Sequence, residues 1–345
     1  MCWAVALVAL PCSAQPTISQ DTATASAPLS TAQIGQIDGF IAFWLNELAQ
    51  AESTDEVRRA RNQIVTQITL PQTSDAFREA FVRSLVTQAQ PLLTGGPLVV
   101  RLNTMIVMSR ARLYGVLELA GQVLGDQNPA VRYWAAKTIE DVISGQPVDG
   151  PPLPRALRQQ LLTALQQAAA KEAEPATLAQ IFSAMAALGA INEVIQALDS
   201  RLPGHVQNPD GLLLPERRAM EQLYIELVRQ LEEQGRAAVE PTIIQLARVS
   251  LLYLTVASEQ LAGAEQMGAE LIEDKRRMVE QADLVLRWAV EQLGQAGVLP
   301  PTIRNAVATS DWGAIVGQLD FWRQELTLDP FNFRPGQLDP ADASE

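Results

Sequence analysis

The chain has 345 residues, of which 48% are hydrophobic and 19% charged, a composition typical of a folded globular protein. Its formal net charge is −13 and its pI is near 4.7, so we expect no binding to nucleic-acid phosphates or to an anionic membrane surface. Both cysteines, Cys2 and Cys12, lie within residues 1–14. Residues 15–345 therefore exclude a disulfide, a thiolate metal site and a cysteine nucleophile.

Residues 1–14 have the features of a secretory signal peptide. Trp3–Leu10 is an apolar run, Pro11 breaks it, and Cys12-Ser13-Ala14 supplies small residues at a cleavage site. The positively charged start of such a signal is missing. Lipid modification of Cys12 is the alternative, and Pro11 disfavours it. We expect export to the periplasm or the exterior, and a mature protein that still began at Met1 would contradict this.

The next residues, 15–29, are rich in Thr, Ser, Ala, Gln and Pro without periodicity, which predicts a flexible linker. Helical repeats are predicted for residues 30–204. Ser30 with Gln33, and Ser53 with Glu56, have the spacing of capping boxes that open the first two helices. A third helix is predicted at about 74–93, before a break at 94–97.

From residue 97 the chain consists of short amphipathic helices joined by tight turns. They are predicted at about 98–109, 113–124, 129–143, 155–172, 176–188 and 192–201. The helix at Pro129 is the clearest, because Asn128 is a suitable N-cap and proline is favoured at the first helical position. Its apolar residues recur at the spacing of one buried face. Helices that cannot bury their apolar faces alone indicate a solenoid.

The helix at Pro129 resembles the second helix of a HEAT repeat, and the resemblance covers about residues 97–145. The matching residues are Asp126, Pro129, Val131, Arg132, Ala135, Ala136 and Ile139. The resemblance implies that Arg132 is structural and bonds to a turn residue such as Asp126. It also implies that Tyr133, Lys137 and Glu140 face solvent on the concave side, where they are candidate contacts for a partner. Trp134 departs from the small residue of the pattern. We expect it in the core, where replacement by Ala costs roughly 3–5 kcal/mol.

The last third of the chain, residues 205–326, predicts longer helices packed as a bundle or hairpin. They are expected at about 220–231, 241–261, 267–293 and 311–326. The most apolar run, Ile243 to Ala257, contains Gln245 and Arg248, so no membrane span is expected. Residues 327–345 predict an extended or disordered tail. With no strand signal, the fold class is all-α: a HEAT-like solenoid of short hairpins, then a longer-helix bundle.

The chain offers few side chains for catalysis. Its one histidine, His205, falls in a Pro- and Gly-rich segment at 202–211, so we interpret it as a solvated loop residue. One histidine excludes a histidine-rich zinc or di-iron site. The carboxylates at 270–274 precede Lys275, Arg276 and Arg277, which predicts a salt-bridged, solvated face with a Glu273–Arg277 pair. No phosphate-binding glycine motif is present. We therefore expect no catalytic residue, cofactor or metal.

The sequence thus favours an exported, non-catalytic helical-repeat scaffold that mediates protein–protein interaction. The alternative is an all-α, glycan-processing enzyme that depends on carboxylates alone. Two carboxylates facing each other across an aromatic-lined cleft would favour the enzyme. The identity of the protein partner and the oligomeric state stay open.

Overall fold

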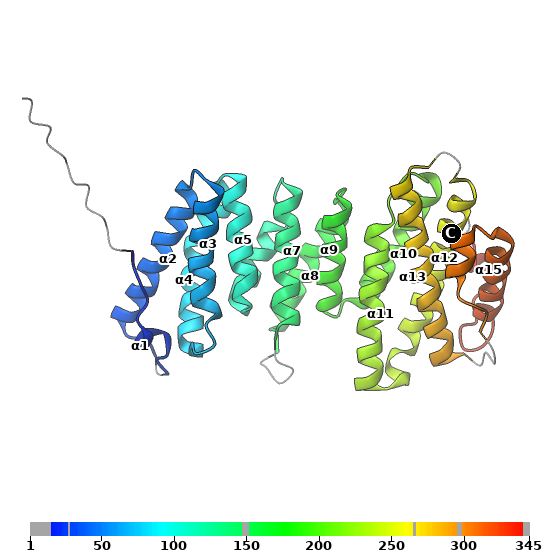
Figure 1. Cartoon of the computed structure of the whole chain (residues 1–345). Helices are drawn as coiled ribbons and strands as arrows, with labels where there is room; N and C mark the ends of the chain where they lie inside the picture. Colours follow the sequence, from blue (N-terminus) through cyan, green and yellow to red (C-terminus); the bar gives the residue numbers. More distant parts are fainter. Residues whose placement is uncertain (1–14, 27, 147–151, 265–266, 295–298, 341–345) are drawn as a thin grey trace, which may run out of the picture. The chain divides into compact units, whose positions relative to one another are not determined.

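The computed structural model describes residues 15–26, 28–146, 152–264, 267–294 and 299–340. The predicted signal peptide, residues 1–14, lies outside this range. The described residues form fifteen α-helices, two short 3-10 helices and no strand (Figure 1). The predicted all-α class is therefore confirmed. The contacts divide the chain into two compact units, residues 1–123 and 124–345, which are described separately.

The first unit consists of two long helical hairpins and a short helical end. Its elements are α1 (Gln20–Ala23), α2 (Thr31–Gln50), α3 (Thr54–Thr69), α4 (Asp75–Gly95), α5 (Leu98–Ala111), η1 (Tyr114–Val116) and α6 (Leu117–Val123). α2 packs on both α3 and α4, and α5 packs on the same two helices. The aromatic side chains of Phe40, Trp44, Phe77 and Phe81 fill the space between them. Each hairpin thereby buries the apolar faces of its neighbour.

The starts of α2 and α3 confirm the predicted capping boxes. The Ser30 hydroxyl accepts from the Gln33 amide while the Gln33 side chain accepts from the Ser30 amide, and Ser53 and Glu56 repeat the arrangement. At each of these helix starts, two backbone amides that have no partner within the helix donate to a side-chain oxygen.

The prediction of a flexible linker at residues 15–29 is wrong over α1. Its Thr22 hydroxyl donates to the Gln36 side chain of α2 at 2.7 Å, and the Ser74 amide donates to the Ala23 carbonyl at 2.9 Å. Ala23 is buried. A polar composition did not reveal these hydrogen bonds, which tie the segment to α2 and to the turn between α3 and α4.

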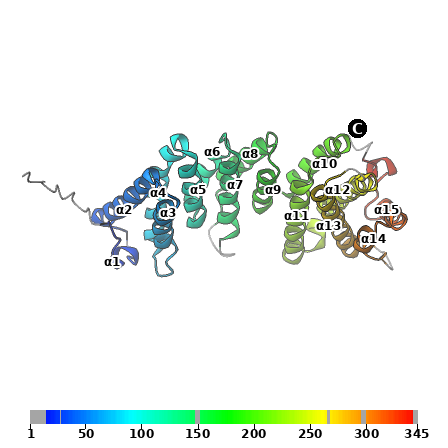
Figure 2. The ribbon, with the colours of Figure 1, turned by 45° about the horizontal axis from the view of Figure 1, so that its top comes forward.

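The second unit holds the remaining helices. Their bounds are α7 (Pro129–Ser144), α8 (Arg155–Ala169), α9 (Pro175–Ala187), α10 (Ile191–Gln207), α11 (Leu214–Gln234), α12 (Arg236–Ala262), α13 (Ala269–Leu293), α14 (Ile303–Thr309), α15 (Trp312–Thr327) and the 3-10 helix η3 (Pro335–Leu338). α7 packs on α9, and α9 packs on α11, so these three helices lie side by side, while α8 and α10 also contact α9 (Figure 2). α12 packs on α10, α11, α13 and α15.

α12 is the core helix of this unit. Among the described residues it is the one helix long and apolar enough to cross a membrane, yet 72% of its most apolar window is buried inside the structure. That burial is typical of a central helix in a packed domain. Its start differs from the prediction, since the helix begins at Arg236 and contains Pro241 instead of starting there.

The predicted boundary at 204/205 is also wrong, because it falls inside α10. The sequence Leu202-Pro203-Gly204 predicted a break, but the helix continues to Gln207 with Pro203 inside it. Leu202 and His205 are both buried and continue the apolar stripe of Val194, Ile195 and Leu198. Packing of this stripe outweighs the hydrogen bond that proline removes.

The predicted extended or disordered tail begins at Thr327, which ends α15, and its remaining described residues, 328–340, are packed. Phe331, Phe333 and Leu338 are buried, and the Phe333 amide donates to the Leu326 carbonyl at 3.0 Å. Arg248 of α12 donates from Nε to the Gln337 carbonyl at 3.1 Å. Proline and glycine prevent a helix here, but three apolar side chains hold the segment against α12 and α15.

Candidate functional site

The predicted start of α7 is confirmed. Asn128 is the N-cap, its side-chain oxygen accepts from the Ala130 amide at 3.0 Å, and Pro129 occupies the first helical position. Val131, Ala135, Thr138, Ile139 and Val142 are buried, as the helical spacing predicted. This cap and this buried face fix the direction in which the other side chains of α7 point.

Arg132 is structural, and its main partner is an acid that the sequence did not indicate. Its guanidinium binds both carboxylate oxygens of Glu172, at 2.6 and 2.8 Å, and also donates to the carbonyls of Asp126 and Gln127. The Glu172 carboxylate is 1% exposed and additionally accepts from the Glu174 amide. The ion pair therefore links the turn before α7 to the turn between α8 and α9.

The pKa values of both partners reflect this pair. The hydrogen bond to Glu172 raises the pKa of Arg132 above its usual range. Burial alone would raise the pKa of Glu172, but the hydrogen bonds from Arg132 and the Glu174 amide lower it overall. Both groups are charged at neutral pH.

The predicted contact residues Tyr133, Lys137 and Glu140 lie on α7 and are all half-buried. Lys137 Nζ lies 2.9 Å from Glu140 and 2.8 Å from Asp141, and Glu140 also accepts from Gln180 Nε2 of α9 at 2.6 Å. Burial lowers the pKa of Lys137, but the hydrogen bonds to Asp141 and Glu140 raise it overall. The half-buried Tyr133, Lys137 and Glu140, together with the buried Gln180, are here called the α7–α9 patch. The polar groups of this patch are held in place by these bonds.

Trp134 is half-buried, so its predicted place in the core is wrong. Its ring meets that of Tyr133 edge to face, with the centroids 6.0 Å apart. The larger side chain lies at the edge of the buried face, next to Tyr133, while the small residues Ala135 and Ala136 are fully buried.

His205 is the largest departure from the sequence analysis. Instead of lying in a solvated loop, it is in the last turn of α10 and only 8% exposed. Its Nε2 lies 3.0 Å from Oε1 of Glu216, a residue of α11 that is fully buried. Arg201 donates from Nε to the same oxygen at 2.6 Å. The Tyr253 ring packs against the imidazole, and its hydroxyl donates to the Leu198 carbonyl at 2.8 Å.

Two charged residues of α13 complete this cluster, which lies entirely within the second unit. Lys275 is fully buried and donates to the Gly211 carbonyl, while Asp274 accepts from the Leu213 amide at 2.6 Å. They anchor the turn between α10 and α11. The predicted solvated face is therefore wrong for Lys275, whereas the exposed Glu273–Arg277 pair forms at 2.8 Å as predicted.

The pKa values in the cluster follow burial and pairing. Burial raises the pKa of Glu216, but His205 and Arg201 lower it overall, so the carboxylate stays ionised. Burial lowers the pKa of Lys275 and raises that of Tyr253 well above its ordinary value.

A signal for these residues exists in the sequence. Glu216 precedes Ala219, Met220 and Leu223, and Lys275 precedes Met278 and Val279, at the spacings of a single helix face. A charge on an apolar stripe indicates a buried pair. The partner across the fold cannot be identified from such spacing.

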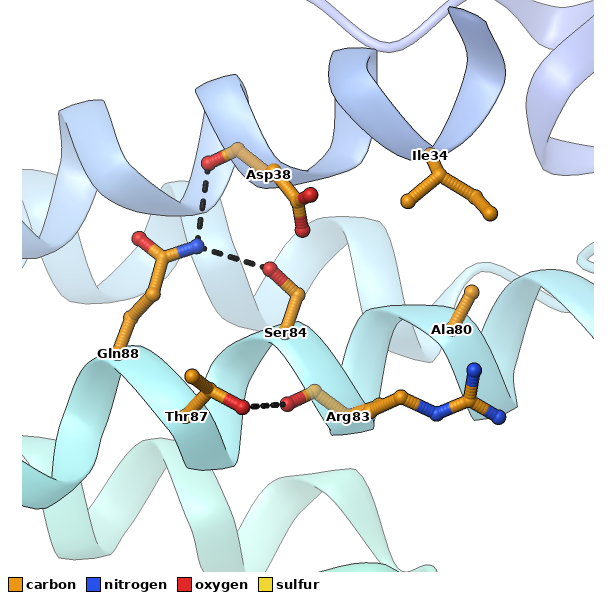
Figure 3. Close-up of a pocket in the computed structure, with 7 residues that line it drawn as sticks. All are labelled: Ile34, Asp38, Ala80, Arg83, Ser84, Thr87 and Gln88. Atoms are coloured by element: carbon orange, nitrogen blue, oxygen red, sulfur yellow. Dashed lines mark hydrogen bonds between the residues drawn. The ribbon is translucent and has the colours of Figure 1, made fainter. Parts of the chain in front are cut away.

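The first unit has an open pocket of about 420 Å³ between α2 and α4 (Figure 3). Gln88 spans it by donating from Nε2 to the Asp38 carbonyl at 3.2 Å and to the Ser84 hydroxyl at 2.8 Å. Asp38 and Arg83 place opposite charges at its rim. The pocket lies between two helices, and Asp38 is the one carboxylate among its lining residues.

Among the described residues, no group of three or more His, Cys, Asp or Glu side chains is arranged to hold a metal ion.

Comparison with known proteins yields no family. No family model matches the chain, and no curated protein matches it. Two engineered proteins solved by the Northeast Structural Genomics Consortium are similar in structure. One is 12% identical with a TM-score of 0.34 and covers 71% of this chain and 97% of its own. The other is 13% identical with a TM-score of 0.33 and covers 94% of this chain and 92% of its own. At such TM-scores neither likeness carries an argument about this chain.

Proposed function

We propose that the chain is an exported, non-catalytic helical-repeat protein that binds a protein partner. The observation that carries the proposal is the row formed by α7, α9 and α11, in which each helix packs on the next and α8 and α10 also contact the middle one. Along the chain, one other helix separates each helix of this row from the next. Such alternation is the arrangement of HEAT-like repeats, in which successive hairpins stack. Repeat proteins of this kind use the surface of one helix row to bind extended partners.

The α7–α9 patch is the part of this row that we assign to the partner. Glu140 binds Lys137 of its own helix and Gln180 of the next, so the polar groups are ordered before a partner arrives. An ordered surface loses less side-chain entropy on binding. Tyr133 adds a half-buried aromatic ring, a residue type enriched among contacts that contribute most to binding.

Site-specific photo-crosslinking tests the proposal. A photoreactive amino acid is placed at Tyr133 in the full chain, and in a second protein at Gln159, which is exposed on α8 of the same unit. Both proteins are expressed in the source cells, irradiated, and the adducts identified by mass spectrometry. We expect one recurrent protein adduct at position 133 and none at 159. Equal labelling at both positions, or none at either, would contradict the proposal.

The alternative of a glycan-processing enzyme has less support from the geometry. Cleavage of a glycosidic bond by the usual route uses two carboxylates. In four pockets lined by described residues, Asp38 is the one carboxylate among the lining side chains. Release of reducing sugar from mixed polysaccharides by the purified chain, lost in Asp38→Asn, would favour the enzyme over the interaction protein.

A further inference from the structure

A cavity lies beside His205, next to the buried Glu216 carboxylate. It measures about 470 Å³ and lies at the turn between α10 and α11. Its polar lining consists of Ser200, Arg201, His205 and Asn208, and none of its lining residues is an acid. Pro175, Leu178, Leu212 and Pro215 supply apolar walls. A volume of this size is typical of pockets for small organic ligands.

Glu216 orients the two strongest polar groups of this cavity. Its buried Oε1 accepts from Arg201 Nε at 2.6 Å and lies 3.0 Å from His205 Nε2. In the described part of the chain, the terminal nitrogens of Arg201 and Nδ1 of His205 have no hydrogen-bond partner. Nδ1 lies against Gly211, where an added Cβ would be 3.5 Å from it. Both side chains are thus fixed at one end and unpaired at the other.

We propose that this cavity binds a small organic carboxylate, with its carboxylate at Arg201 and His205 and its apolar body against Leu178 and Leu212. A guanidinium presents parallel N–H groups that match the two oxygens of a carboxylate. Because Glu216 already fixes the Arg201 side chain, little of its rotamer entropy remains to be lost on binding. The apolar walls supply burial for the rest of the ligand.

The imidazole of His205 is held among charged and aromatic side chains. An imidazole whose Nδ1 carries a proton donates from that atom to the ligand carboxylate. The groups that face the imidazole are Arg201 of α10, Glu216 of α11 and Tyr253 of α12, and Lys275 of α13 lies behind the turn at Gly211. The pKa of Glu216 is lowered overall, so its carboxylate stays ionised as the anchor of Arg201.

The presence of one histidine in the whole chain makes the test direct, because every imidazole signal in a nuclear magnetic resonance spectrum belongs to His205. The full chain is titrated with benzoate, with acetate and with benzyl alcohol, up to about 10 mM, which is ten times a fragment-like Kd of about 1 mM. We expect a saturable shift with benzoate, a weaker one with acetate and none with benzyl alcohol. No saturable shift with benzoate, or an equal shift with benzyl alcohol, would overturn the proposal.

Two variants assign the binding to this cavity. Arg201→Lys removes the planar fork, and we expect the benzoate affinity to fall at least tenfold. Gly211→Ala places a methyl group beside Nδ1 and leaves the Arg201–Glu216 pair intact. We expect it to weaken benzoate binding as well, so it tests the cavity even if Arg201→Lys does not fold. Arg229→Ala, at an exposed ion pair of α11, is the control and retains wild-type affinity. Unchanged binding in Gly211→Ala would place the ligand elsewhere and contradict the proposal.

Discussion

At the scale of single residues, the fully buried Glu216 carboxylate makes the stability of the fold depend on pH. It accepts from Arg201 and His205, and these partners lower its pKa overall despite the opposing effect of burial. In the unfolded chain the same carboxyl has a pKa of about 4.3. Its contribution to stability is therefore complete above about pH 4.3 and is lost as the pH falls through the lower, folded pKa.

Glu216→Gln should lower the free energy of unfolding by about 1–3 kcal/mol at pH 7, because charged hydrogen bonds are replaced by neutral ones. Urea denaturation at a series of pH values measures this difference. We expect it to shrink as the carboxyl protonates in acid. Glu233→Gln, at an exposed pair on the same helix, is the control and should cost less than about 0.5 kcal/mol. A wild-type advantage as large at pH 3 as at pH 7 would contradict this account of Glu216.

Trp134→Ala should cost less than a core aromatic. The ring is half-buried, so we expect a loss of about 1–2 kcal/mol. Phe182 of α9 is fully buried in the same unit, and Phe182→Ala should cost about 3–5 kcal/mol. The two variants are compared by urea denaturation. Equal costs would show that Trp134 is in the core, as the sequence predicted.

At the scale of helices, the Arg132–Glu172 pair holds the turn before α7 and the turn between α8 and α9 together. Arg132→Lys replaces a planar fork by one ammonium, which cannot bind both Glu172 oxygens and two turn carbonyls together. We expect a loss of about 1–3 kcal/mol in urea denaturation. Arg218→Lys, at an exposed pair of the same unit, is the control and should change stability by less than about 0.5 kcal/mol. Equal effects would contradict a structural role for Arg132.

Some helix boundaries could be predicted from the sequence and others could not. The starts of α2, α3 and α7 could be predicted because Ser30, Ser53 and Asn128 act on amides within a few residues. The continuation of α10 through Pro203 could not, because it depends on contacts with helices farther along the chain. The same holds for the candidate sites. Arg132 was correctly predicted as structural, but its partner Glu172 is 40 residues away. His205 was misjudged because a local stop signal hid its position on a buried stripe.

At the scale of the whole molecule, the acidic charge belongs almost entirely to the second unit. Residues 1–123 contain nine acidic and eight basic side chains, whereas residues 124–345 contain thirty acidic and eighteen basic ones. Mutual repulsion opposes the compact state of the second unit, and salt screens it.

Raising the ionic strength from about 0.01 to 0.15 M shortens the Debye length from about 30 to 8 Å, so it should protect the second unit more than the first. Hydrogen exchange followed by mass spectrometry on the full chain separates the two units by their peptides. We expect slower exchange in helices α7 to α13 at the higher salt and little change in α2 to α5. A uniform change across both units would contradict the charge argument.

The central claim is that the α7–α9 patch binds a protein partner, and the affinity of the captured partner for patch variants tests it most directly. With the partner purified, its Kd is measured for wild type, Tyr133→Ala and Gln159→Ala by calorimetry, and circular dichroism verifies folding. We predict at least a tenfold weaker Kd for Tyr133→Ala, equivalent to about 1.4 kcal/mol, and no change for Gln159→Ala. A wild-type Kd for Tyr133→Ala, or equal losses in both variants, would contradict the claim.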